Sequence, residues 1–178
     1  PGIYEHNKAL LDLAKRAAQV SAGDASGDVI SGFENVVGSQ FDDVLTGSAD
    51  DNYISGGAGN DTLSGGPGGV DTIDGGQGDD YIIAGSGTNA LDGGDGYDWI
   101  SYQGLSASNS VSVDLSMNKA QVIIAQVPHH QDTLYSIEAV RGGDGNDTLT
   151  GDAGDNFLRG GKGNDVLDGG AGSDWALS

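Results

Sequence analysis

The sequence has no cysteine among its 178 residues, and basic side chains are scarce. Without cysteine the chain can form neither a disulfide nor a thiolate metal site. Seven Lys and Arg against 27 acids give a formal net charge of −20, so the basic footprint that nucleic-acid binding needs is missing. Binding to an anionic membrane surface is disfavoured for the same reason. No apolar run approaches the roughly 18 residues of a transmembrane helix, so we expect no membrane span.

Glycine and aspartate are the residues that the sequence has in excess. Its 33 glycines far exceed the usual share of about 7%. The acids are 24 Asp and only 3 Glu, whereas selection for solubility alone would use both. This preference for the shorter carboxylate indicates a geometric role, because an Asp side chain can bend back to work alongside its own backbone.

The excess is organised as a nine-residue repeat. The stretch GGAGNDTLS, which begins at Gly56, has glycine at positions one, two and four, Asp at position six and an apolar residue at position eight. Related nonapeptides in the same phase, several of them degenerate, make a run of seven from Gly38 and a run of four from Gly142. The repeat predicts a stack of short strands, each with one inward side chain.

A second period of about one hundred residues relates the two runs. Shifted by 104 positions, the segment from Asp28 lies over the segment from Asp132 without a gap. Residues 7–20 have the pattern of an amphipathic helix, but at a shift of 102 LDLAKRAAQV lies over VDLSMNKAQV, which follows a strand-like alternation. We therefore expect both segments to be extended, with a helix at residues 7–20 as the alternative.

The chemistry of the nonapeptide predicts a metal site. Glycines at positions one, two and four let the backbone adopt positive φ and turn carbonyl groups inward, and the Asp at position six adds a carboxylate. A ligand set of oxygen atoms alone favours a hard cation, and its flexible, carbonyl-rich character suits Ca²⁺ better than Mg²⁺. Stacked turns about 4.8 Å apart would otherwise place carboxylates where each pair repels by roughly 3 kcal/mol.

The tandem nonapeptides resemble those of the RTX (repeats-in-toxin) family. The resemblance implies a right-handed parallel β-roll in which alternate nonapeptides stack and hold Ca²⁺ between them. It implies an all-β fold with two tandem rolls, each preceded by extended strands that cover its open end. The corresponding regions are a first lead-in at residues 1–37, a first calcium roll at 38–101, a second lead-in at 102–141 and a truncated second roll at 142–178.

The same resemblance assigns the metal ligands, several ions in all. One column of the first roll would stack Asp43, Asp61, Asp80 and Asp98, and the other Asn52, Asp71 and Asn89. In the second roll Asp147 would stack with Asp165, and Asn156 with Asp174. The carbonyl ligands would come from Gly57, Gly59, Gly76, Gly78, Gly94, Gly96, Gly143, Gly145, Gly161 and Gly163. We expect tighter binding in the all-Asp column, because each Asn removes one ligand charge. Glu34 and Glu138 are candidate first-turn ligands that would stack on Asn52 and Asn156.

For the histidines, the aromatic residues and the possible nucleophiles we expect ordinary structural roles. His129 and His130 are expected in a solvated loop. Aromatic residues at position seven, among them Trp99, Phe157 and Trp175, are expected to pack along the strands, with stacking on sugars as the alternative. No nucleophile has a recognisable base nearby in the sequence, so we expect no catalysis by this chain.

The resemblance also implies a function. The chain is expected to be a calcium-binding module, a monomer, within a larger secreted bacterial protein that leaves by type I secretion and folds on Ca²⁺ outside the cell or at its surface. There it would act as a spacer, as in an adhesin, or assist secretion. Two alternatives stay open: a module that binds extracellular polysaccharide beside an enzyme such as an alginate epimerase, and part of an RTX protease or lipase. Neighbouring repeats of the same protein are further candidate partners.

Overall fold

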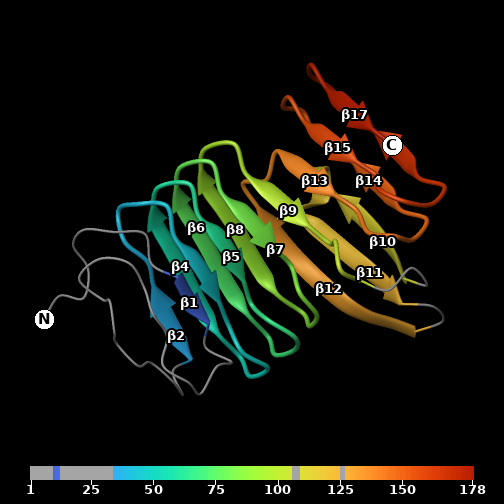
Figure 1. The fold of residues 1–178 in the computed structure, drawn as a ribbon. Coiled ribbons are helices and arrows are strands. Elements are labelled where there is room, and N and C mark those ends of the chain that lie inside the picture. Colours follow the sequence, from blue (N-terminus) through green and yellow to red (C-terminus); the bar gives the residue numbers. More distant parts are fainter. Residues whose placement is uncertain (1–9, 13–33, 106–108, 125–126) are drawn as a thin grey trace, which may run out of the picture.

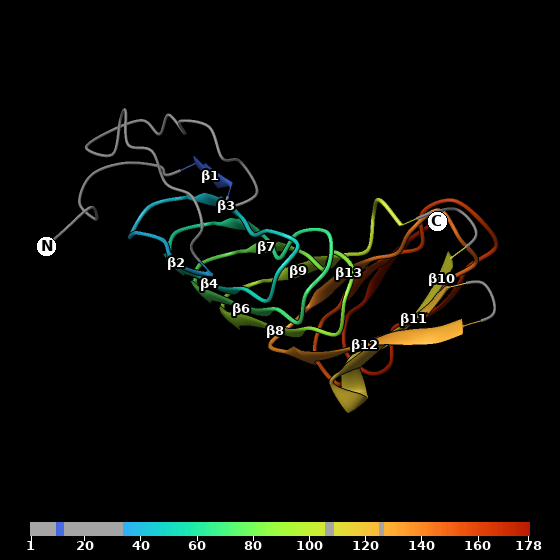
Figure 2. The ribbon, with the colours of Figure 1, turned by 90° about the horizontal axis from the view of Figure 1, so that it is seen from below.

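The computed structural model describes residues 10–12, 34–105, 109–124 and 127–178, and these form a parallel β-roll (Figure 1). Successive nonapeptide strands fall alternately into two sheets that face each other across one core (Figure 2). The described residues contain no α-helix, and their one short helix is the 3-10 turn η1 (Leu115–Met117). Among them, no helix is long and apolar enough to cross a membrane. The all-β prediction is confirmed.

One sheet has eight strands and the other nine. In spatial order the eight-stranded sheet contains β1 (Leu10–Asp12), β3 (Val44–Thr46), β5 (Thr62–Ser64), β7 (Tyr81–Ile83), β9 (Trp99–Ser101), β13 (Ala139–Arg141), β15 (Phe157–Arg159) and β17 (Trp175–Leu177). The nine-stranded sheet contains β16 (Val166–Asp168), β14 (Thr148–Thr150), β10 (Asn109–Asp114), β11 (Lys119–Ile124), β12 (Val127–Tyr135), β8 (Ala90–Asp95), β6 (Thr72–Gln77), β4 (Tyr53–Ala58) and β2 (Asn35–Val37).

Strand pairing follows the nine-residue period. Alternate nonapeptides pair in parallel, so that Leu63 lies between Leu45 and Ile82 in the eight-stranded sheet. In the nine-stranded sheet Ile54, Ile73 and Leu91 lie in register in the same way. The stacking of alternate nonapeptides is therefore confirmed.

The core consists of the middle residue of each short strand. Leu45, Ile54, Leu63, Ile82 and Leu158 are each at most 2% exposed, and they belong to one continuous cluster. Burying such a side chain contributes roughly 2 kcal/mol. Because each nonapeptide contributes only one of them, the fold depends strongly on what happens in the turns between strands.

The second lead-in joins the two runs of repeats into one solenoid. In the eight-stranded sheet β13 pairs with β9 of the first run and β15 of the second. In the nine-stranded sheet β10, β11 and β12 form an antiparallel meander, whose outer strands pair in parallel with β14 and β8 (Figure 1). The lead-in thus continues both sheets. The division of the chain at residues 38, 102 and 142 stays a prediction.

The first lead-in is described only in part. Residues 10–12 form β1, which pairs with β3, and Asn35–Val37 form β2, which pairs with β4. The other residues of segment 7–20 lie outside the described part of the chain, so the alternative of a helix there is not tested. The expectation of a loop at His129 and His130 was wrong, because both residues belong to β12, which pairs with β11.

A buried hydrogen bond fastens the junction between the first run and the meander. The hydroxyl of Tyr102, only 1% exposed, donates to Asp132 Oδ2 at 3.0 Å. The main-chain N–H of Asn89 donates to the other oxygen of the same carboxylate at 2.8 Å. Both oxygens of this buried acid are therefore satisfied.

We expect Tyr102→Phe to lower the free energy of unfolding by about 2 kcal/mol, because Asp132 Oδ2 would lose its partner in a dry site. Thermal or urea unfolding in saturating Ca²⁺ measures the change. Tyr53→Phe is the matched control, since Tyr53 is 41% exposed and its ring lies at the surface. Equal effects of the two substitutions would contradict a structural role for the Tyr102 hydroxyl.

Candidate metal centre

The residues at position six form a ladder along the roll. On the side of the eight-stranded sheet, the main-chain N–H of Asp43 donates to Asp61 Oδ1, that of Asp61 to Asp80 Oδ1, and that of Asp80 to Asp98 Oδ1, at 2.7–2.8 Å. The N–H of Asp98 donates to Glu138 Oε2 at 2.9 Å. One oxygen of each carboxylate thus links its turn to the turn stacked beside it.

The opposite side of the first run carries a similar ladder. The N–H of Asn52 donates to Asp71 Oδ1 and that of Asp71 to Asn89 Oδ1, both at 3.0 Å, and Asn89 continues it to Asp132. The columns predicted for the first run are therefore brought together as expected.

The second run continues both ladders. The N–H of Asp147 donates to Asp165 Oδ1 and that of Asn156 to Asp174 Oδ1, each at 2.9 Å. The all-Asp pair, Asp147 and Asp165, lies on the side of the nine-stranded sheet, where the first run has its mixed column. The acidic column therefore changes sides between the two runs.

Glycine serves two distinct purposes in these turns. Eight of the ten predicted ligand glycines at positions two and four have positive φ, as predicted: Gly57, Gly59, Gly76, Gly78, Gly94, Gly96, Gly161 and Gly163. The carbonyl oxygens of Gly57 and Gly59 lie so close to Gly76 and Gly78 that a Cβ on either would overlap them.

Two parts of the glycine prediction were wrong. Gly143 and Gly145 do not have positive φ, and neither do the glycines at position one, such as Gly56 and Gly75. At position one glycine is needed for space instead. A Cβ on Gly75 would overlap Asp80 Oδ2 and the carbonyl oxygen of Gly93, which converge beside it. The missing side chain leaves a cradle lined by a carboxylate and a main-chain carbonyl.

Four carboxylate oxygens in these cradles have no hydrogen-bond partner among the residues that the structure describes. The Oδ2 atoms of Asp61, Asp71, Asp80 and Asp98 are buried and accept no hydrogen bond, although each residue is at most 1% exposed. Leaving a buried charged group without a partner is costly unless a proton or a cation neutralises it.

The pKa values of these four carboxyl groups are raised, because burial disfavours the charged form. Burial, reinforced by the charges of Asp80 and Asp43, raises the pKa of Asp61 to about 7. Burial, reinforced by Asp80 and Glu138, raises the pKa of Asp98 to about 6. The pKa values of Asp71 and Asp80 are also raised, chiefly by burial.

The donor set fits a hard divalent cation. Within the described residues no three acidic or histidine side chains converge on one point, so a cation here would rely on main-chain carbonyls as well. Carboxylate Oδ2 atoms beside glycine carbonyls, without sulfur or imidazole, are the flexible oxygen ligands that Ca²⁺ accepts. We call the turns with Asp61, Asp71, Asp80 and Asp98 the open turns, because their Oδ2 atoms remain available.

In four other turns a main-chain N–H of the same turn donates to a side-chain oxygen of the position-six residue, and we call them closed turns. The N–H of Ser39 donates to Asp43 Oδ2 at 2.6 Å, and that of Gly143 donates to Asp147 Oδ2 at 2.7 Å. In the same way Ser48 and Asp152 donate to the amide oxygens of Asn52 and Asn156. Their position-two residues, Ser39, Ser48, Gly143 and Asp152, all lack positive φ, whereas all four open turns have it there, at Gly57, Gly66, Gly76 and Gly94. The backbone at position two therefore separates the two classes.

Asn89 closes its turn by a different contact. Its Nδ2 donates to the carbonyl oxygen of Ala84, the position-one residue, at 2.9 Å. The amide hydrogen thus supplies the positive partner that a cation would supply beside an Asp. This neutral contact agrees with the expectation that Asn-containing turns bind Ca²⁺ less tightly, which stays a prediction.

Two acidic residues of the ladders were missed or only partly anticipated. Asp132 takes the place of a position-six residue beside Asn89, yet it lies 43 residues further along the chain. Glu138 was expected to stack on Asn156, and it does accept Asn156 Nδ2 at its carbonyl oxygen, but its side chain bonds to Asp98. Only the 104-residue period, which lays Asp28 over Asp132 and Glu34 over Glu138, carries a signal for these positions.

Comparison with known families agrees with this geometry. A family model described as RTX calcium-binding nonapeptide repeat (4 copies) matches residues 37–69, 68–100 and 141–176. These stretches contain both runs of repeats and cover more than half of the chain. No curated protein is significantly similar to the chain.

We expect Asp80→Asn to weaken calcium binding much more than Asp147→Asn. Asp80 loses an available Oδ2, whereas Asp147 Oδ2 is already bonded to the Gly143 N–H. The loss at Asp80 should be roughly tenfold or more, since removing even outer partners of a metal ligand costs about 10–100-fold. Isothermal titration with Ca²⁺ measures both variants. Equal losses would contradict the division into open and closed turns.

Calcium binding should also depend on pH. A raised carboxyl pKa means that the metal-free roll is most stable when Asp61 and Asp98 are protonated, and it loses that stability as the pH rises through 6–7. Calcium needs the ionised form, so its affinity should rise between about pH 5 and pH 8 and level off above the raised pKa values. Calcium titrations at several pH values test this, and an affinity that is constant across the range would refute it.

Proposed function

Because the chain belongs to the family of RTX calcium-binding nonapeptide repeats, we propose that it is a structural module whose folding is driven by Ca²⁺. The observation that carries the proposal is the set of four buried Oδ2 atoms without a partner, at Asp61, Asp71, Asp80 and Asp98. A bound Ca²⁺ would supply the positive charge that these cradles lack. The protein's own contribution is to hold these Oδ2 atoms in buried turns, where those of Asp61, Asp80 and Asp98 lie near the main-chain carbonyl oxygens of Gly75, Gly93 and Ser136 respectively.

The energetics support a module in which Ca²⁺ binding decides whether the chain is folded. Extracellular calcium modules commonly have dissociation constants of about 10⁻⁴–10⁻³ M. A ligand at ten times its dissociation constant stabilises the folded state by about 1.4 kcal/mol per site. Four open turns would then contribute about 6 kcal/mol, which is comparable to the whole stability of a typical domain, about 5–15 kcal/mol.

This balance fits a module that is unfolded where Ca²⁺ is scarce and folded where it is abundant. We propose that the parent protein is a larger bacterial protein exported by type I secretion, and that this part of it folds outside the cell or at its surface. RTX repeats are typical of secreted bacterial proteins, which supports the proposal. In that setting the continuous solenoid would serve as a spacer, as in an adhesin, or assist secretion.

We assign no catalytic role to the chain itself. The acidic side chains at position six lie in the ladders, where they hold turns together or point into cradles. An RTX protease or lipase as the parent protein remains compatible with this assignment. A module that binds extracellular polysaccharide is the second candidate, and it is favoured by a basic and aromatic surface on the eight-stranded sheet.

The decisive experiment is far-UV circular dichroism of the chain in EGTA, followed by titration with Ca²⁺ and, as a control, with Mg²⁺. We expect a cooperative change from coil to β with Ca²⁺ alone. Asp80→Asn should shift the midpoint to higher Ca²⁺, because it removes one charged ligand. A spectrum that is already fully β in EGTA and does not respond to Ca²⁺ would refute calcium-driven folding.

A further inference from the structure

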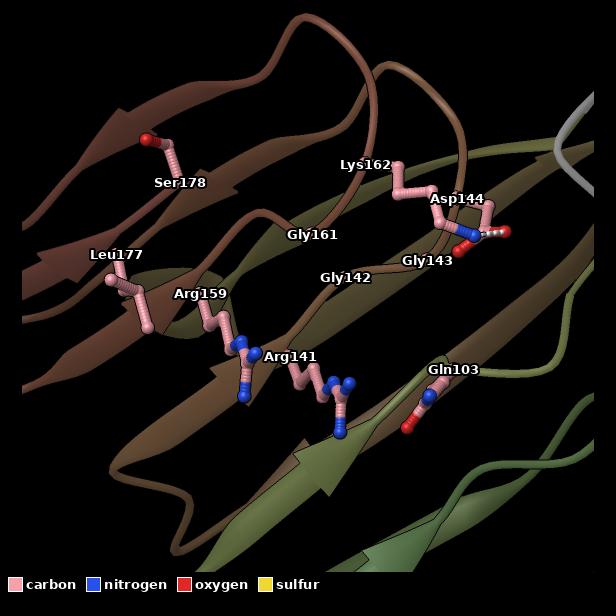
Figure 3. A pocket seen from close by; sticks show the side chains of 10 residues that line it. All are labelled: Gln103, Arg141, Gly142, Gly143, Asp144, Arg159, Gly161, Lys162, Leu177 and Ser178. Atoms are coloured by element: carbon pink, nitrogen blue, oxygen red, sulfur yellow. Dashed lines mark hydrogen bonds and ion pairs between the residues drawn. The ribbon is translucent and has the colours of Figure 1, made fainter.

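Three of the basic side chains of this acidic chain lie at one place. Of its seven Lys and Arg, Arg141, Arg159 and Lys162 line a single pocket of about 420 Å³ (Figure 3). Lys162 Nζ pairs with Asp144 Oδ2 at 2.6 Å. That contact is the one ion pair within the described part of the chain, so neither arginine has a carboxylate partner there.

The two arginines lie next to each other. Arg141 of β13 and Arg159 of β15 are partners in the strand register. Figure 3 shows their side chains extending in the same direction, with the amide of Gln103 nearby. Two like charges on adjacent strands repel each other, and an anion between them would turn the repulsion into attraction. Planar guanidinium groups are well suited to hold a carboxylate by paired hydrogen bonds.

An aromatic row runs beside the arginines. Phe157 and Arg159 flank the inward Leu158, so both lie on the outer face of the eight-stranded sheet. The rings of Trp99 and Phe157 are 5.1 Å apart at an angle of 46°, across the strand that carries the small Ala139. Trp175, in register with Phe157, is 72% exposed. The sheet therefore presents a row of rings and a row of guanidinium groups side by side.

We propose that this arginine–aromatic face, made of Trp99, Arg141, Phe157, Arg159 and Trp175, binds an acidic polysaccharide whose sugars carry carboxylate groups. The C–H faces of the sugar rings would pack on the aromatic row, and the carboxylates would bond to the arginines. Two neighbouring guanidinium groups suffice for the carboxylates of a short oligosaccharide whose remaining contacts are with the rings, whereas a nucleic acid would need an extended basic track along its phosphates, which is missing. The face exists only in the folded roll, so the inference rests on the proposed calcium-dependent module.

The test is calorimetric titration of the whole chain, in Ca²⁺, with short oligogalacturonates. The matched ligand is the same oligomer with its carboxyl groups methyl-esterified, and single-stranded DNA is the second comparison. We expect binding of the acidic oligomer alone. Arg141→Ala and Arg159→Ala should each weaken it roughly tenfold, the size expected for a lost charge-assisted hydrogen bond. Trp175→Ala should also weaken it.

Two control variants remove the same groups from the other sheet. Lys119→Ala in β11 removes one positive charge, and Tyr53→Ala in β4 removes an exposed ring. Both should bind as the unchanged chain does. Circular dichroism in Ca²⁺ verifies that each variant is folded, and Arg141→Gln and Arg159→Gln replace any alanine variant that is not.

Several results would overturn the proposal. These are equal binding of the esterified oligomer, binding that the arginine variants leave unchanged, no binding at all, or binding of DNA in place of the acidic oligomer. A chain that folds on Ca²⁺ but binds no oligomer would refute the face and leave the calcium module intact. A chain that needs no Ca²⁺ to fold yet binds through Arg141 and Arg159 would refute the calcium switch and support the face.

Discussion

The whole roll depends on one repeated hydrogen bond, from the main-chain N–H of a position-six residue to a side-chain oxygen of the turn stacked beside it. This bond fixes Oδ1 of Asp61, Asp80 and Asp98 within the fold. It also decides where the second oxygen goes, which is into a buried turn beside a main-chain carbonyl. Structure and metal chemistry are therefore carried by the two oxygens of the same carboxylate, and neither can be changed without affecting the other.

Most of this arrangement was predictable from the sequence, because the period of nine is also the period of the structure. Phase alone places Asp43 beside Asp61 and Leu45 beside Leu63, which are two periods, or 18 positions, apart. The sequence did not predict the contacts of the segment where the nine-residue period is interrupted. The meander of β10 to β12 brings Asp132 to Asn89 across 43 residues, and no local spacing indicates that contact. The strand containing His129 and His130 was missed for the same reason.

The glycine pattern was predictable in position but not in purpose. Gly56 and Gly57 are adjacent and identical in type, yet only Gly57 adopts positive φ. Gly56 is required because its Cβ would occupy the space of Asp61 Oδ2. Conversely, Gly143 matches the motif but adopts the backbone of a closed turn and bonds to Asp147. The residue pattern sets which backbone conformations a turn can adopt, and the contacts with neighbouring turns select one of them.

The ladder bonds all point the same way, and this gives the solenoid a polarity. In every rung the donor lies earlier in the chain than its acceptor, as in Asp43 to Asp61 or Asn156 to Asp174. Shortening the chain from its N-terminal side removes donors of this ladder and leaves each remaining position-six N–H with its acceptor, whereas shortening it from the C-terminal side removes acceptors. The bonds one position earlier run in the opposite direction, as from the N–H of Asn60 to Asp42 Oδ1. Each turn is therefore held by the turn before it and by the turn after it, through different residues.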